Sequence, residues 1–141
     1  MLDETQAYPR AEQHLRDAVT ALDADIRLEP ELRNAVSPPP ESGQSHLVNV
    51  EVSYVAKLPE SDDVFARNRG LFERLKKWWL GQGYELVTDN PSEPFTVLRV
   101  ADPHDGFVIA LRQGKIGNLW FTVNSPLVTP TGVEPPPPGL T

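Results

Sequence analysis

An alternation of apolar and mainly polar residues in the segment HLVNVEVSYVAKL, residues 46–58, constrains the fold of this chain most strongly. One side of this segment carries only apolar residues, namely Val48, Val50, Val52, Tyr54, Ala56 and Leu58. Most positions on the other side are polar, namely Asn49, Glu51, Ser53 and Lys57. A period of two is typical of a β-strand with one buried and one hydrated face. The chain therefore needs a second layer that covers one face of a sheet.

Two amphipathic segments are suited to form that layer. Residues 9–28 carry an apolar stripe at helical spacing, and Pro9 suits the first turn of a helix, where its missing N–H has no partner to lose. Residues 62–80 form a second predicted helix, which follows Ser61, a residue type favoured at helix N-caps. This helix is predicted to end at Gly81 or Gly83, because glycine readily adopts the left-handed conformation found after helices.

Four more strands are predicted after the second helix, at residues 84–88, 95–100, 107–113 and 118–124. Short turns rich in Asp, Pro and Gly separate them, so neighbouring strands are expected to pair in an antiparallel manner. The order helix, strand, helix and four strands predicts an α+β fold. We expect a two-layer sandwich with a mainly antiparallel sheet of about five strands and two helices.

The 141 residues suffice for a single domain, which we place at residues 1–125. Ten of the 15 prolines lie in the stretches 30–40 and 126–138. Residues 28–45 are interpreted as a connection with a short helical turn at 30–35 and a flexible linker at about 36–45. Residues 126–141 are predicted to be a Pro-rich disordered tail, because they offer no apolar face to bury.

Charge and composition exclude several classes of protein. A net charge of −7 argues against general nucleic-acid binding, which requires a basic surface. The chain has no Cys, so it forms no disulfide and no Cys-ligated metal site. No apolar run reaches the roughly 18 residues of a transmembrane helix. The opening residues MLDETQAYPR lack the pattern of a signal peptide.

Motifs for catalysis, cofactors and metals are absent from the sequence. His14, His46 and His104 do not have the spacing of a metal site, and neither a nucleophile elbow nor a phosphate-binding loop occurs. His104 lies between Asp102 and Asp105 in the turn DPHDG, where such residues are favoured by turn geometry alone. The sequence therefore predicts no catalytic residue, no metal and no cofactor, and we expect a protein that is not an enzyme.

A basic group in the second helix is the candidate binding site. Five basic residues and one acidic residue lie between positions 67 and 77. Such a run is most often a solvated face. Alternatively, it docks an acidic protein or an anionic membrane or envelope polymer, or the acidic first helix lies beside it. The candidate binding residues are Trp78, Arg67, Arg74, Lys76 and Lys77.

The two tryptophans of the segment FERLKKWWLGQGYELV are expected to have different surroundings. At 100° per residue, Trp79 falls inside the apolar arc of the helix, whereas Trp78 falls at its rim beside Arg67 and Arg74. We therefore expect Trp79 in the core and Trp78 partly exposed, where it is available to a partner.

The segment GYELVTDNPSEPFTVLRVADPHDGFVIALRQGKIGNLWFTVNSPLV resembles the C-terminal half of small actinobacterial envelope lipoproteins of unknown function. The shared features are a Gly-Tyr strand start, a hairpin centred on Asp-Gly and a last strand that runs into Ser-Pro, and the match covers roughly residues 60–128. The resemblance implies an exported domain of the cell envelope with no established activity. This chain departs from the pattern because it lacks a lipobox Cys and a signal peptide.

The sequence thus favours a non-enzymatic binding or interaction domain. If the native N-terminus precedes Met1, we expect the domain in the cell envelope or outside the cell. If Met1 is the native start, we expect a cytoplasmic accessory protein that binds a partner chain through a sheet edge or the basic helix.

Overall fold

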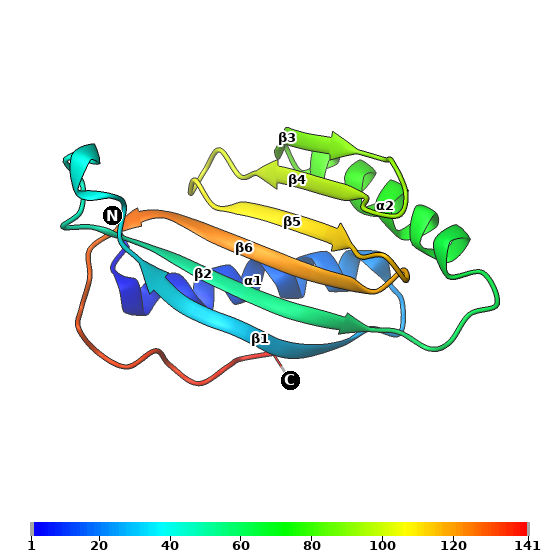
Figure 1. Cartoon of the computed structure of the whole chain (residues 1–141), viewed down its shortest axis with the longest axis horizontal. Helices are drawn as coiled ribbons and strands as arrows, with labels where there is room; N and C mark the ends of the chain where they lie inside the picture. The colour runs from blue at the N-terminus through cyan, green and yellow to red at the C-terminus, as the bar shows by residue number, and fades with distance from the viewer. Residues whose placement is uncertain (1, 141) are drawn as a thin grey trace.

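The structure, a computed structural model, describes residues 2–140. Its elements in chain order are α1 (Glu4–Leu22), β1 (Arg27–Val36), the 3-10 turn η1 (Pro40–Ser42), β2 (Val48–Lys57), α2 (Val64–Gly81), β3 (Glu85–Asn90), β4 (Val97–Ala101), β5 (Val108–Gln113) and β6 (Leu119–Val128). The strands form one antiparallel sheet in the order β1-β2-β6-β5-β4-β3, and both helices lie against the same face of it (Figure 1). The predicted α+β sandwich is confirmed, with six strands in place of about five.

Strand β6 holds the sheet together. It pairs with β2 on one side and with β5 on the other, so it joins the β1–β2 hairpin to the β3–β4–β5 meander. Helix α1 lies over β2 and β6, and α2 lies over β3 and β4. The helix-covered face of the sheet supplies the core, in which Val52, Tyr54, Phe121, Val123 and Ile109 are fully buried.

Helix α1 begins earlier and ends earlier than the predicted range 9–28. Asp3 caps it: its side chain accepts a hydrogen bond from the N–H of Gln6, and the Gln6 side chain accepts one from the N–H of Asp3. This capping box satisfies two amides that a helix start otherwise leaves unpaired. Pro9 therefore lies inside the helix rather than in its first turn. At the other end, Asp23 adopts a left-handed conformation with φ of 47° and stops the helix.

Helix α2 confirms the prediction for residues 62–80, but its N-cap is Asp63 and not Ser61. The Asp63 carboxylate accepts a hydrogen bond from the N–H of Ala66 at 3.0 Å. Ser61 supports the cap, since its hydroxyl accepts from the N–H of Asp63 at 3.3 Å. Gly83 follows the helix with φ of +89°, which a residue with a side chain adopts only with strain.

The connection predicted at residues 28–45 is wrong for its first half. Residues Arg27–Val36 form the edge strand β1, which replaces the helical turn predicted at 30–35, and the linker at 36–45 is the β1–β2 loop that contains η1. Pro30 is tolerated because it lies at a register shift of an edge strand. Both sides of β1 are partly exposed, so its sequence lacks a clear period of two.

The disordered tail predicted at residues 126–141 is wrong for residues 126–128, which complete β6. Residues 130–140 form no helix or strand, but they run back along α1 and β1 (Figure 1). Arg33 donates a hydrogen bond to the carbonyl of Pro136 at 2.5 Å, and the N–H of Gly139 donates to Glu12 at 3.4 Å. The tail thereby covers the buried ion pair of Glu12 and Arg33, whose closest charged atoms are 3.3 Å apart. Thr141 lies outside the described residues.

Neither α1 nor α2, nor any other helix in residues 2–140, combines the length and apolar character that crossing a bilayer requires.

Candidate functional site

The two neighbouring tryptophans of α2 differ in burial as predicted. Trp79 has no exposed surface, and its ring stacks on that of Tyr84 with the centroids 6.4 Å apart. Trp78 is half-buried and also approaches Tyr84, with a centroid separation of 6.4 Å. Trp79 is therefore part of the core, and Trp78 lies at its border.

Two of the five candidate binding residues make contacts that join α2 to neighbouring segments. Arg67 donates to the carbonyl of Pro59 at 2.6 Å, and Arg74 donates to the carbonyl of Leu22 at 3.0 Å. These contacts fasten α2 to the loop before it and to the end of α1. The remaining three of the set are the partly exposed Trp78, Lys76, which binds a carboxylate of β3, and Lys77, which is exposed.

The acidic first helix lies beside α2, as the third alternative expects, but within residues 2–140 no carboxylate of α1 forms an ion pair with a basic residue of α2. The contact of Arg74 with Leu22 is made to a backbone carbonyl and not to a carboxylate. Of the acidic residues of α1, Glu12 pairs with Arg33 of β1 and Asp17 accepts from Gln13 of the same helix.

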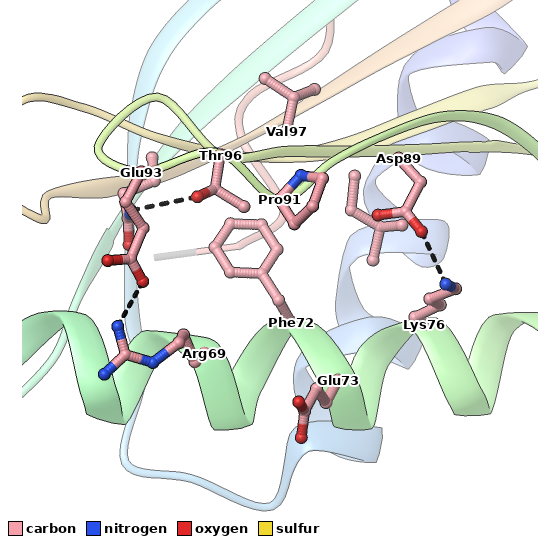
Figure 2. A pocket seen from close by; sticks show the side chains of 11 residues that line it. Arg69, Phe72, Glu73, Lys76, Asp89, Pro91, Glu93, Thr96 and Val97 are labelled. Carbon is pink, nitrogen blue, oxygen red and sulfur yellow. Dashed lines mark hydrogen bonds and ion pairs between the residues drawn. The ribbon is translucent and has the colours of Figure 1, made fainter.

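A groove lies between α2 and the β3–β4 hairpin, and Lys76 of the predicted site lines it. It has a volume of about 330 Å³ and includes Phe72, Pro91, Thr96 and Leu98 in its lining. Figure 2 shows the Phe72 ring rising from α2 between two ion pairs. We call this cavity, with Phe72 at its centre, the α2 groove.

Two ion pairs cross the α2 groove from the helix to the sheet. Arg69 contacts Glu93 at 2.5 Å, and the Lys76 ammonium contacts Asp89 at 2.6 Å (Figure 2). Both pairs are accessible to water, which screens their charges, so they contribute little to stability. Their main effect is to place paired charges on both sides of an apolar floor.

The walls of the α2 groove are held by a buried amide pair. Asn68 is fully buried, and its side chain donates to Gln113 at 2.8 Å and to the carbonyl of Gly117 at 2.7 Å. Gln113 in turn donates to the carbonyl of Pro94 at 2.7 Å. Because buried amides are costly to leave unpaired, this chain fixes the β3–β4 loop relative to α2. The groove is therefore formed before a ligand enters it.

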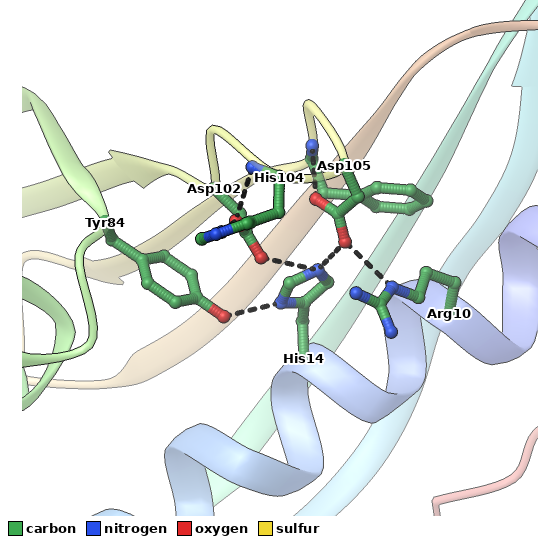
Figure 3. Close-up of polar contacts among 7 residues, drawn as sticks. Arg10, His14, Tyr84, Asp102, His104 and Asp105 are labelled. Carbon is green, nitrogen blue, oxygen red and sulfur yellow. Dashed lines mark hydrogen bonds and ion pairs between the residues drawn. The ribbon is translucent and has the colours of Figure 1, made fainter.

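A second polar cluster joins α1 to the β4–β5 turn (Figure 3). His14, which is 5% exposed, contacts Asp105 through Nε2 at 2.7 Å and the Tyr84 hydroxyl through Nδ1 at 2.9 Å. Arg10 donates to the same Asp105 oxygen at 2.8 Å. Asp102 lies 3.9 Å from Nε2 of His14. Two side chains of α1 thus meet two carboxylates from one turn.

The hydrogen bonds of this cluster explain why Asp105 is ionised. Burial raises the pKa of Asp105, but the N–H of Phe107 and the hydrogen bonds from His14 and Arg10 outweigh burial, so the pKa lies below its ordinary value. An ionised Asp105 is an acceptor only, so Nε2 of His14 must carry the proton in their contact.

The cluster contains the atom types of a metal site, but the ring nitrogen that would bind the metal carries a proton. Ligand atoms of His14, Asp102 and Asp105 lie within 4.8 Å of one another. A metal ion needs an unprotonated ring nitrogen, whereas Nε2 is occupied by its proton and Arg10 already neutralises Asp105. The geometry therefore favours an ionic clamp between α1 and the β4–β5 turn.

The chain from Tyr84 through His14 to Asp105 also has the order of a nucleophile, a base and an orienting acid. Burial first, and then the charges of Asp102 and Asp105, raise the pKa of Tyr84 to about 12. An activated nucleophile needs a lowered pKa, so the surroundings shift Tyr84 in the wrong direction.

His104 lies at the outside of this cluster, with its side chain 81% exposed and Nδ1 at 3.1 Å from Asp102. The turn DPHDG places His104 beside the two aspartates in sequence, but the fold brings His14 to Asp105. The two partners His14 and Asp105 are 91 positions apart, and only the fold brings them together. The sole signal in the sequence is a histidine at the edge of the apolar stripe of α1.

No protein-family model, curated protein or solved structure matches this chain. The resemblance to actinobacterial envelope lipoproteins therefore stays a prediction.

Proposed function

We propose that this protein is a non-enzymatic binding domain that takes an apolar group of its ligand into the α2 groove. The observation that carries this proposal is the cavity of about 330 Å³ with Phe72 at its centre and an ion pair on either side. Ligand sites are typically concave, largely apolar and pre-formed, with a few polar groups that orient the ligand, and their volumes start at about 300 Å³.

The polar cluster around His14 supports a binding role over catalysis. Its groups satisfy one another, and the raised pKa of Tyr84 opposes the formation of a phenolate. The cluster is made of Tyr84 and of residues from α1 and the β4–β5 turn, none of which lines the α2 groove. A clamp of this kind stabilises the scaffold on which the groove is built.

A second candidate role is the addition of a partner strand at β3, in keeping with the alternative of an accessory protein. β3 is the last strand of the sheet on the α2 side, and Leu86 and Val87 on it are exposed. The register shift at Val87 interrupts this edge, and such bulges protect edge strands from pairing. The α2 groove is therefore the preferred site.

The cell-envelope setting implied by the sequence resemblance forms part of this proposal. The genomic sequence upstream of the codon for Met1 tests it. A signal peptide with a lipobox in the same reading frame supports export, and a native start at Met1 supports the cytoplasmic alternative.

Binding of anilinonaphthalene sulfonate tests the α2 groove. The aromatic rings of this probe suit the apolar floor, and its sulfonate suits Arg69 and Lys76. We expect amide chemical shifts to change at the groove when the probe is added to the isotope-labelled protein. Thr96→Leu extends an apolar side chain into the cavity and should weaken binding by about tenfold.

Thr122→Leu is the matched control, because Thr122 is half-buried on β6 and does not line the groove. It should leave the dissociation constant within about twofold, a change below 0.5 kcal/mol. Shift changes on another surface, or equal weakening by both variants, would contradict a ligand site in the α2 groove.

A further inference from the structure

The face of the sheet opposite the helices has no second layer. Both helices lie behind the sheet in Figure 1, and no other element of residues 2–140 crosses its front. Four side chains form a row across the middle of this open face, directly opposed on β2, β6, β5 and β4, namely Val55, Trp120, Arg112 and Val97. All four are half-buried.

Two arginines on this face differ from all the others. Seven of the nine arginines donate a hydrogen bond to a carboxylate, an amide or a backbone carbonyl. Within residues 2–140, Arg99 and Arg112 donate none and form no ion pair. They are diagonal neighbours on β4 and β5, since Arg112 opposes Val97 and Arg99 opposes Ala110. The two unpaired guanidinium groups therefore lie side by side.

The surroundings of Arg112 are unfavourable for a cation. Burial first, and then the neighbouring Arg99, lower the pKa of Arg112, and the carboxylate of Glu51 opposes this effect from a distance too long for an ion pair. Ala110 beside them is only 1% exposed, although no layer covers it. Long side chains therefore lie across this part of the sheet and hold both charges near an apolar surface. A bound carboxylate would relieve the mutual repulsion of the two arginines.

We propose that Arg99, Arg112 and Trp120, which we call the arginine–tryptophan face, bind an acidic segment of a partner protein. The two arginines supply the donors for carboxylates, and Trp120 supplies a flat apolar contact. Arginine and tryptophan are also the residue types that dominate the energetics of protein interfaces. This site is separate from the α2 groove and does not depend on a ligand there.

The spacing of the two arginines matches an extended peptide. Diagonal neighbours on adjacent strands lie roughly 7–8 Å apart. Side chains at positions i and i+2 of an extended chain lie on one side of it, about 6.8 Å apart. Two carboxylates separated by one residue can therefore reach Arg99 and Arg112 together.

The charge around the face selects a short acidic segment over a long polyanion. The arginines form a local positive site on a chain with a net charge of −7, and Glu51 and Glu29 lie beyond β6 on strands β2 and β1. A nucleic acid or an anionic membrane extends over these carboxylates and is repelled by them. A peptide with two or three carboxylates fits inside the positive area.

The test uses a labelled peptide of sequence Ser-Gly-Glu-Val-Glu-Val-Glu-Gly-Ser with blocked ends, and the same peptide with Gln in place of each Glu. We expect the acidic peptide to bind the whole protein, to shift the amide signals of β4, β5 and β6, and to bind less tightly as salt rises. The Gln peptide should bind at least about tenfold more weakly, because charged acceptors form the stronger hydrogen bonds with guanidinium groups.

A pair of double variants separates the site from general electrostatics. Arg99→Gln with Arg112→Gln should weaken binding of the acidic peptide by about tenfold or more, because both donors to the carboxylates lose their charge. Lys77→Gln with Lys115→Gln changes the net charge by the same amount at exposed positions and should change binding less than about twofold. Because Arg99 and Arg112 make no internal hydrogen bond, their replacement should leave the thermal transition intact.

Three results would overturn the proposal. The first is equal weakening by the two double variants, and the second is tighter binding to phosphatidylglycerol vesicles than to the acidic peptide. The third is salt-sensitive dimerisation of the protein alone, measured by sedimentation and abolished by the Arg99 and Arg112 changes, which would assign the face to a second copy of this chain. If the arginine variant fails to fold, Trp120→Leu replaces it, with weaker peptide binding expected and unchanged binding as the refuting result.

Discussion

Replacement of Trp79 by Ala should destabilise the protein far more than replacement of its neighbour Trp78. Trp79 is wholly buried and stacks on Tyr84, so its loss leaves a large cavity between α2 and the sheet. Large-to-small changes of a buried Trp cost about 3–5 kcal/mol. Trp78 is half-buried, and we expect Trp78→Ala to cost about 1–2 kcal/mol, in proportion to the apolar area that it removes from water.

Urea denaturation followed by far-ultraviolet circular dichroism measures both effects without relying on tryptophan fluorescence. A domain of this size has a denaturant slope of about 1–3 kcal/mol per molar. At a slope of about 2 kcal/mol per molar, the midpoint should fall by about 1.5–2.5 M for Trp79→Ala and by less than about 1 M for Trp78→Ala. Trp79→Phe serves as a second variant that keeps part of the packing if Trp79→Ala does not fold. Equal midpoints, or a larger drop for Trp78→Ala, would refute the assignment of Trp79 to the core.

Other perturbations test the remaining features. Stability should fall as the pH rises from about 10 to about 12, because the pKa of Tyr84 is about 12 in the folded state and about 10 in the unfolded state. Urea midpoints measured across this pH range should show the fall, and Tyr84→Phe should reduce it. Deletion of residues 130–141 should lower the melting temperature by more than about 4 °C, since it uncovers the buried Glu12–Arg33 pair, and an unchanged melting temperature would mean that the tail does not pack. Lys76→Glu should destabilise by about 0.5–1 kcal/mol because it faces Asp89, whereas Lys77→Glu at an exposed position should not; equal midpoints in urea would argue against the contact across the α2 groove. His104→Asn should leave anilinonaphthalene sulfonate binding within about threefold, and a loss of about 100-fold would show a direct role for that ring.

The elements that could be predicted from the sequence are those that have one buried apolar face and one exposed polar face. In β2, apolar and polar residues alternate because one face packs on α1 and the other is hydrated, so the strand can be read from its pattern. The edge strand β1 has partial exposure on both sides and a Pro at its register shift, so the same reasoning gave a loop. When both faces of a strand are exposed, apolar and polar residues no longer alternate, so no period of two marks the strand.

Prediction of the candidate sites from sequence was limited by the distance between their residues along the chain. The burial of Trp79 followed from helical geometry alone. The acidic partners of Arg69 and Lys76 could not be predicted in this way. Glu93 and Asp89 lie in the β3–β4 loop and on β3, and they meet α2 only because the β3–β4 hairpin packs against it. Likewise, Arg99 and Arg112 are neighbours only through the pairing of β4 with β5, which a count of charges along the sequence does not reveal.

The position of β6 at the centre of the sheet sets the order in which the chain can fold during synthesis. β1 and β2 can pair early, and β3, β4 and β5 can pair with one another, but each of these parts presents an open edge until β6 emerges. Open edges and exposed apolar faces make such intermediates prone to aggregation. Completion of the sheet also requires contacts between strands far apart in sequence, which slows folding. The two halves of the sheet therefore join only after residues 119–128 have been made.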